Sequence, residues 1–189
     1  MRWLGVLSYS YTMNNDAAIR DVFLTELNRW SFPVTDWEVA TAKKIARLPV
    51  ISVHRVPAAQ LEWMRVKPRQ CHVNARFMEE NDPEKRTKRV IGWWSQDGNY
   101  VLHFIVRSRG DYVCVTPVDE KMDAGSPFPF IRDPKIEVRE ENGFHGYYRD
   151  GVKIGPGVRR DPSKTPAEIE IVRQRLLSGM DPYEAVKLP

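Results

Sequence analysis

The sequence predicts an α+β fold in which amphipathic helices flank a sheet built from antiparallel hairpins. Apolar residues recur at intervals of three and four near both ends of the chain, which is typical of helices. The middle of the chain instead alternates short β-prone runs with Asn-Gly and Asp-Gly dipeptides, which are hairpin-turn signals. Because hairpins stand where crossover helices would be needed, a doubly wound parallel sheet is not expected.

Length and composition indicate a globular chain with one sizeable core. Its 189 residues are 42% hydrophobic and 29% charged, which excludes long disorder. No apolar run reaches the roughly 18 residues that a membrane-spanning helix needs, and the first residues lack the features of a signal peptide. Two cysteines are too few for a disulfide framework, although a single bridge stays open. We therefore expect a cytoplasmic protein that does not enter the membrane.

A helical N-terminal subdomain is predicted over residues 1–67. Its first helix follows a cap at 14–16, its second begins with a capping box at 35–38, and its third begins at Pro57. A short strand is expected at 50–56, between the second and third helices. None of these elements carries chemistry of its own, so we interpret them as packing around the core.

The α+β core is predicted within residues 68–155. A helix is expected from Cys71 to Glu80, with Asn74, Phe77 and Met78 on its buried face. The strand-forming runs that follow are 89–94, 100–107, 112–115, 136–138, 144–148 and 152–154. The first three runs predict a three-stranded antiparallel meander, and the others predict further hairpins.

Residues 156–189 are predicted to form a linker and a C-terminal helix. Thr165-Pro166 supplies a cap and a proline at the first helical position, and Gly179 ends the helix. The apolar face of this helix comprises Ile169, Val172, Leu176 and Leu177. Packing on the chain's own core is the expected role, and docking onto a partner subunit is the alternative.

The residues best suited to chemistry are a thiol at a helix start and a histidine on a strand. The sulfur of Cys71 would face the free N–H groups and the positive end of the helix dipole, which predicts a lowered pKa. Lys67 and Arg69 act in the same direction. His103 lies in the middle strand of the meander, where it can act as the base that activates a nucleophile.

The residues around this pair resemble a group of uncharacterised bacterial and phage proteins. The shared motifs are Cys-His-x-Asn at 71–74, Gly-Trp at 92–93, the strand residue His103 and Val-Thr-Pro at 115–117. Their order of elements is similar to the papain-like cysteine-hydrolase core in its transglutaminase-like form. The resemblance covers residues 70–117, about a quarter of the chain.

This resemblance implies acyl chemistry on an amide or ester bond, as in a peptidase, amidase, deamidase or transglutaminase-like enzyme. Cys71 would be the nucleophile and His103 the base. The backbone N–H of Cys71 and the side chain of Gln70 would hold the oxyanion. The residues expected to support the site structurally are Asn74, Trp93 and Thr116.

One position departs from the pattern of that group. Cys114 stands where the group has Asp before Val-Thr-Pro, so the third catalytic position holds a thiol. A thiol cannot stabilise an imidazolium by charge. Asp111 and Asp119 are the nearest carboxylates, and the pattern places neither of them beside His103. Slow catalysis by a Cys–His pair and complete loss of activity both stay open.

The alternative function is an inactive scaffold that binds a protein or a nucleic acid. Residues 65–89 carry the whole net charge of +4, which would attract an acidic partner. Acidic residues interleave with the basic ones, however, and no nucleic-acid-binding motif accompanies them. The sequence therefore favours an amide or ester substrate, which includes a protein, over nucleic acid.

A zinc site is the remaining chemical alternative. Cys71, His72, His103 and Cys114 together form a tetrahedral ligand set. Adjacent residues on a helix point about 100° apart, so the first two rarely share a metal ion. No Cys-x-x-Cys spacing or phosphate loop is present either. We therefore expect no metal and no other cofactor.

Overall fold

The computed structural model describes residues 16–96, 98–117 and 127–188, and the chain divides into two compact units. The first unit comprises residues 1–46, 96–100 and 155–189. The second comprises residues 47–95 and 101–154. The first unit is therefore built from three separate stretches of sequence.

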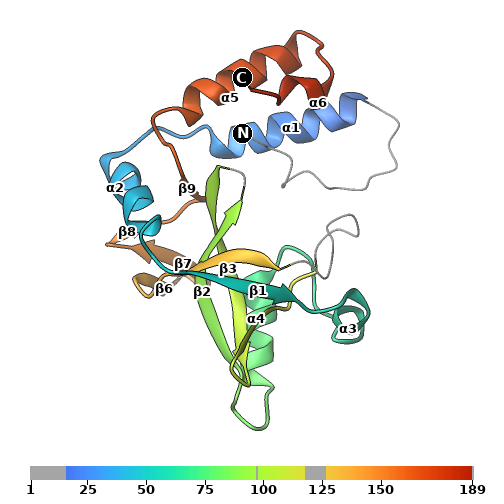
Figure 1. The fold of residues 1–189 in the computed structure, drawn as a ribbon, viewed down its shortest axis with the longest axis vertical. Coiled ribbons are helices and arrows are strands. Elements are labelled where there is room, and N and C mark those ends of the chain that lie inside the picture. The colour runs from blue at the N-terminus through green and yellow to red at the C-terminus, as the bar shows by residue number, and fades with distance from the viewer. Residues whose placement is uncertain (1–15, 97, 118–126, 189) are drawn as a thin grey trace. The chain divides into compact units, whose positions relative to one another are not determined.

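Helices from both ends of the chain meet in the first unit (Figure 1). Its elements are α1 (Asp16–Trp30), α2 (Asp36–Ile45), β9 (Gly157–Arg159), α5 (Thr165–Leu177) and α6 (Pro182–Ala185). α1 packs against α5 and α6, and α2 packs against β9. The predicted helices are confirmed here, whereas β9 lies in a stretch predicted to be a linker. No helix in the described ranges is long and apolar enough to cross a membrane.

A buried ion pair joins α2 to β9. Arg159 Nη2 lies 2.6 Å from Glu38 Oε2, and both side chains are almost wholly buried. The backbone N–H and Nε of Arg159 donate to Glu38 Oε1 at 3.0 and 2.8 Å. Arg159 Nη1 also donates to the carbonyl oxygen of Phe32 at 3.0 Å. This network satisfies the charge of both partners inside the unit.

Strands of the second unit close into a small barrel. They are β1 (Val50–Arg55), β2 (Lys88–Gln96), β3 (Asn99–Ser108), β4 (Asp111–Cys114) and β5 (Phe128–Arg132). Their order is β2-β5-β1-β4-β3, and β2 also pairs with β3. The pair β3–β4 is antiparallel, as predicted. The pairs β1–β5 and β2–β5 are also antiparallel, but β5 lies in a stretch for which the sequence predicts no strand.

The β1–β4 pair is parallel, so the prediction of a wholly antiparallel sheet is wrong at this seam. The segment between β1 and β4 contains two helices and the β2–β3 hairpin. It is long enough for β4 to run in the same direction as β1. β1 is therefore a barrel strand. The sequence pattern places it in the N-terminal subdomain instead, together with α3 (Ala58–Trp63), which also belongs to the second unit.

Alternate residues of β3 face two different apolar clusters. Ile105 lies inside the barrel in a cluster with residues of β1, β4 and β5, namely Val53, Cys114, Phe128 and Phe130. Phe104 and Val106 face the other way and pack against Ala75 of α4 (Cys71–Glu80). α4 therefore covers the outer side of β3 and β4.

α4 has the predicted bounds but a different buried face. Asn74 and Ala75 are buried, whereas Phe77 is 49% exposed. The prediction that Phe77 is a core residue is therefore wrong. A similar difference occurs at Leu177, which ends α5 and is 62% exposed. Both residues lie at the edge of an apolar stripe, where the contact with the neighbouring element decides their burial.

A second sheet follows the barrel strands in sequence. It consists of β6 (Ile136–Glu141), β7 (Phe144–Arg149) and β8 (Val152–Lys153), all antiparallel. The turns at 142–143 and 150–151 have positive φ, as the predicted Asn-Gly and Asp-Gly hairpins require. These hairpins are confirmed.

Candidate active site

His103 and Cys114 lie side by side within the barrel. They come from the adjacent strands β3 and β4, and both side chains are buried. His103 Nε2 is 3.3 Å from Cys114 Sγ. The thiol also donates to the carbonyl oxygen of Thr116 at 3.9 Å. The residue at the third catalytic position therefore contacts the imidazole directly.

Aromatic rings and a cation surround the imidazole of His103. The rings of Trp94, Phe128 and Phe130 have centroids 5.6, 5.8 and 6.5 Å from it. Burial, and to a smaller extent the positive charge of Arg55, lowers the pKa of His103 to about 3. The imidazole is therefore neutral at physiological pH, and no carboxylate in the described part of the chain hydrogen bonds to it.

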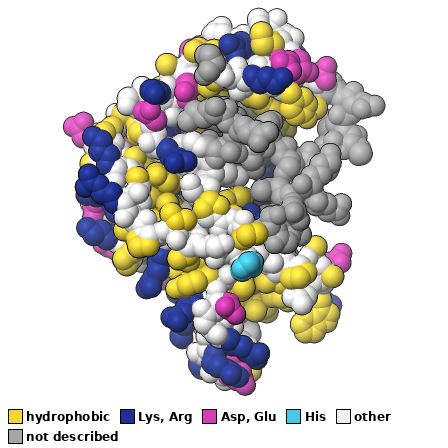
Figure 2. Space-filling view, in the orientation of Figure 1, with side chains coloured by type: hydrophobic (Ala, Val, Ile, Leu, Met, Phe, Trp, Pro, Cys, Tyr) yellow, Lys and Arg dark blue, Asp and Glu magenta, His cyan; other side chains and the backbone are white. Residues whose placement is uncertain are grey.

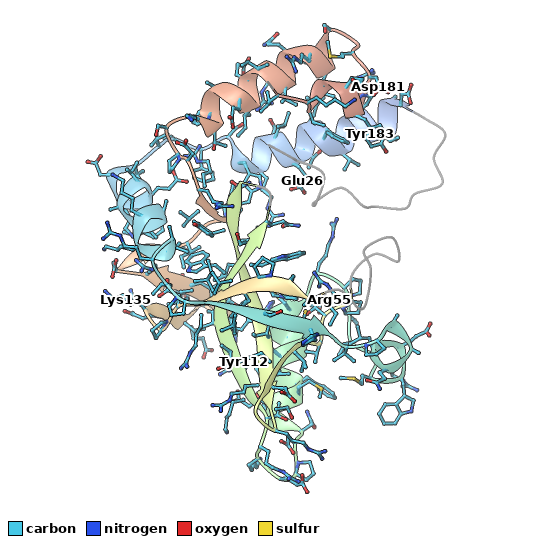
Figure 3. All side chains as sticks on the ribbon, viewed as in Figure 1. Glu26, Arg55, Tyr112, Lys135, Asp181 and Tyr183 are labelled. Carbon is cyan, nitrogen blue, oxygen red and sulfur yellow. The ribbon has the colours of Figure 1, made fainter. Side chains whose placement is uncertain are left out.

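Arg55 reaches the same cluster from the end of β1 (Figure 3). Its Nη1 donates to Cys114 Sγ at 4.0 Å. Its guanidinium carbon lies over the rings of Phe128 and Trp94, at 4.3 and 4.9 Å from their centroids. Sequence reasoning missed this residue because it belongs to no motif and reaches Cys114 only through the parallel β1–β4 pairing.

Cys71 begins α4 as predicted, but its sulfur belongs to a different cluster. It packs with the apolar residues between α4 and the barrel, which include Phe104 and Val115. In the described structure, no hydrogen bond joins Cys71 to His103. Both cysteines are free thiols.

The predicted lowering of the Cys71 pKa is wrong. Burial raises the pKa of this thiol above its ordinary value. The backbone N–H groups of Phe104 on β3 and of His72 and Cys71 at the helix start oppose that change, and the helix-start argument expects the last two. Their effect is smaller than the desolvation that comes from packing against the barrel.

Three of the other predicted site residues, Gln70, Asn74 and Thr116, lie next to the cysteines in sequence or in the bonding network. Gln70 precedes α4, is exposed and makes no capping bond with its side chain. Asn74 Nδ2 donates to the carbonyl oxygen of Lys67 at 2.7 Å and contacts Thr116 Oγ1 at 3.4 Å. This amide ties the helix start to the segment after β4.

Trp93 lies in a separate polar cluster. Its Nε1 donates to Asp133 Oδ2 at 2.8 Å, and Arg149 Nε donates to the same oxygen at 2.6 Å. Both partners are buried. Trp93 therefore holds the strand β2 against the start of the second sheet. The two hydrogen bonds of this cluster involve neither Cys71 nor Cys114.

No carboxylate replaces the missing acid in the described structure. Asp111 begins β4 and pairs with Ser108 beside the turn, at the opposite end of the strand from Cys114. Asp119 lies outside the described residues. The described residues also contain no group of three or more His, Cys, Asp or Glu side chains arranged to hold a metal ion.

The basic stretch 65–89 is partly compensated by its own acids. Glu79 lies 3.0 Å from Arg89 and 3.9 Å from Lys88, and Glu84 forms an ion pair with Arg86. Figure 2 shows basic and acidic side chains next to one another at the lower end of the view. This mixture offers no uniform positive surface for a nucleic-acid backbone.

The second unit thus brings together the thiol of Cys114, a neutral imidazole and a buried guanidinium, and the thiol of Cys71 lies in the neighbouring cluster. This set supports nucleophilic chemistry when a base removes the thiol proton. Comparison with protein-family models, curated proteins and solved structures finds no match for this chain.

Proposed function

We propose that this chain is a papain-like cysteine hydrolase or acyltransferase, with Cys71 as nucleophile and His103 as base. The observation that carries the proposal is the environment of the Cys71 sulfur at the start of α4. Backbone N–H groups of the helix start and of Phe104, the residue after His103, lower the pKa of this thiol against the larger effect of burial, which raises it. Negative charge develops there when a thiol becomes a nucleophile.

The reaction in this proposal is acyl transfer. His103 removes the thiol proton, and the sulfur of Cys71 attacks the carbonyl carbon of an amide or ester. His103 then gives the proton to the leaving amine or alcohol, which departs and leaves a thioester. Water or an acceptor amine next attacks the thioester while His103 removes its proton, and the C–S bond then breaks to release the acid or the new amide. His103 passes the proton to the departing sulfur, which restores the thiol of Cys71.

Two further groups support this chemistry. The proposed oxyanion donors are the backbone N–H of Cys71 and the side-chain amide of Gln70, which makes no capping hydrogen bond to α4. The imidazole contacts Cys114 at 3.3 Å and makes no hydrogen bond to Cys71 in the described structure. The proposal therefore requires the imidazole of His103 to leave Cys114 and to contact the thiol of Cys71 when substrate binds.

An inactive binding scaffold is the second candidate function. It is favoured by the protonation state of the site, because burial raises the pKa of Cys71 and holds that of His103 at about 3. Neither group is then charged at neutral pH, and an active thiolate–imidazolium pair is absent. A protein is the expected partner, since acidic side chains interleave and pair with the basic ones of the stretch 65–89.

Acylation by an activated ester distinguishes the two candidates. The protein is treated with p-nitrophenyl acetate, and mass spectrometry locates the added acetyl group. We expect a thioester on Cys71 in the folded wild-type protein, none at this position in Cys71→Ala, and much slower formation in His103→Gln. A folded protein whose Cys71 reacts only after unfolding would support the scaffold instead.

A further inference from the structure

Arg55 is a buried cation whose charge is not balanced by a carboxylate in the described part of the chain. Arg55 is 8% exposed. Its hydrogen bond within the described part of the chain is the one to the sulfur of Cys114. The buried arginines Arg149 and Arg159 each lie 2.6 Å from a buried carboxylate. A buried charge is costly unless it is paired, and Arg55 differs from both in lacking an anionic partner among the described residues.

The groups around Arg55 do not supply the missing negative charge. Burial raises the pKa of the Cys114 thiol, so this sulfur is neutral near pH 7 even with the guanidinium beside it. His103 is an imidazole and carries no negative charge in its ordinary forms. Thr116 offers the thiol a carbonyl oxygen, which is also neutral. None of the groups that the structure describes around Arg55 therefore supplies its counter-ion, and a bound molecule can take that place.

The surroundings of the guanidinium favour a carboxylate as that counter-ion. The rings of Phe128 and Trp94 lie against it at 4.3 and 4.9 Å, which leaves its N–H edge for hydrogen bonding. A guanidinium edge matches the two oxygens of a planar carboxylate. One cation between aromatic rings balances a single negative charge better than the nearly double charge of a phosphate.

We propose that Arg55 binds a carboxylate, from a small organic acid or from the C-terminus of a peptide, beside His103 and Cys114. The ring contacts of Arg55 hold the N–H edge in place, so the site exists before the ligand arrives. The neutral imidazole of His103 is a second donor within the same cluster. This binding site goes beyond the acyl chemistry at Cys71 and does not depend on it.

Thermal unfolding in sodium acetate tests the site. We expect the Tm of the wild-type protein to rise and saturate with acetate, and to rise much less with sodium chloride at the same ionic strength. Arg55→Lys keeps the charge but loses the paired N–H donors of the guanidinium, so we expect acetate to bind this variant about tenfold more weakly. Arg107→Lys is the matched control, because Arg107 is exposed and lies over the ring of Tyr112 at 5.9 Å. An equal acetate response in wild type and Arg55→Lys would overturn the proposal.

Cys114→Asp provides a second and independent test. It supplies a carboxylate to Arg55 from within the chain, so the stabilisation by acetate should disappear while the protein stays folded. A full acetate response in folded Cys114→Asp would contradict the site. Cys71→Ala should bind acetate as the wild type does, so this proposal and the proposed catalysis fail separately.

The source of the carboxylate is identified with a matched pair of peptides. Acetyl-Ala-Ala with a free C-terminus is compared with the same peptide carrying a C-terminal amide. Tighter binding of the free acid than of acetate indicates a peptide end, and equal binding indicates a small organic acid. Equal binding of the free acid and the amide would overturn recognition of a carboxylate.

Discussion

Arg55 and Cys114 face each other across the parallel pair of strands that closes the barrel. They are register partners, and the guanidinium Nη1 lies 4.0 Å from the sulfur. His103 lies on the other side of the same sulfur, at 3.3 Å. A thiol therefore separates a cation from an imidazole at a position where a carboxylate would pair with both.

Cys114→Asp is expected to raise the reactivity of Cys71. A carboxylate at this position would offset the charge of Arg55 and stabilise an imidazolium at His103, which makes the imidazole a better base. We expect the alkylation rate of Cys71 near neutral pH to rise by about tenfold or more. Cys114→Asn, which has a similar shape without the charge, is the control. Equal rates in folded Cys114→Asp and Cys114→Asn would contradict a triad-like arrangement.

His103 is expected to make the protein less stable in acid. Its pKa is about 3 in the folded protein, against an ordinary value of 6.5, so the unfolded chain binds a proton that the folded chain does not. The contribution is complete above pH 6.5 and falls by about 1.4 kcal/mol for each pH unit from there to about pH 3. Urea unfolding at a series of pH values measures this slope.

The histidine responsible is identified with two variants. His103→Phe removes the titrating group and should have a smaller pH slope than the wild type. His54→Phe removes an exposed histidine and should keep the wild-type slope. A His103→Phe protein with an unchanged slope would show that another group is responsible.

Removing one partner of the Glu38–Arg159 ion pair is expected to destabilise the protein, mainly because the other buried charge is left unpaired. Glu38→Ala leaves a buried guanidinium unpaired and should lower the free energy of unfolding by about 3–5 kcal/mol. Glu38→Leu combined with Arg159→Met should recover much of this loss. Denaturant unfolding measures both, and Glu184→Ala in the exposed pair with Lys187 should change little. A double variant less stable than Glu38→Ala would contradict the argument.

Gly92 is expected to tolerate no side chain. A Cβ atom there would lie 2.2 Å from the carbonyl oxygen of Ile131 and 2.7 Å from the ring of Phe130. Gly92→Ala should therefore cost at least about 1–3 kcal/mol of stability, because backbone and a buried ring would have to move. Gly155→Ala is the control, since a Cβ atom added at Gly155 would meet no described atom within 4 Å. Equal Tm values for the two variants would contradict the predicted clash.

Local signals in the sequence were enough to predict most helices and hairpins. The N-cap of α2 at Thr35, the two hairpin turns with positive φ and the start of α4 at Cys71 all depend on neighbouring residues. The parallel β1–β4 pairing and the strand β9 depend on partners far away in the chain, and no local pattern indicates them. Prediction therefore failed where closure of the barrel or assembly of the first unit decides the structure.

The candidate site divides in the same way. The thiol at a helix start and the histidine on a strand could be found from sequence, because their types and positions are local properties. The sequence could not show that burial raises the pKa of Cys71, because this burial results from packing of α4 against the barrel. Arg55 escaped notice because only tertiary pairing brings it to Cys114.

The three-part construction of the first unit has a consequence for synthesis on the ribosome. α1 and α2 are made before the barrel, whereas α5 and β9 are made after the second sheet. Phe23, Leu27 and Trp30, which are buried in the finished fold, must therefore wait for their partners while more than half of the chain is translated. During that interval the first helix exposes an apolar stripe, and exposed apolar surface makes a nascent chain prone to aggregation.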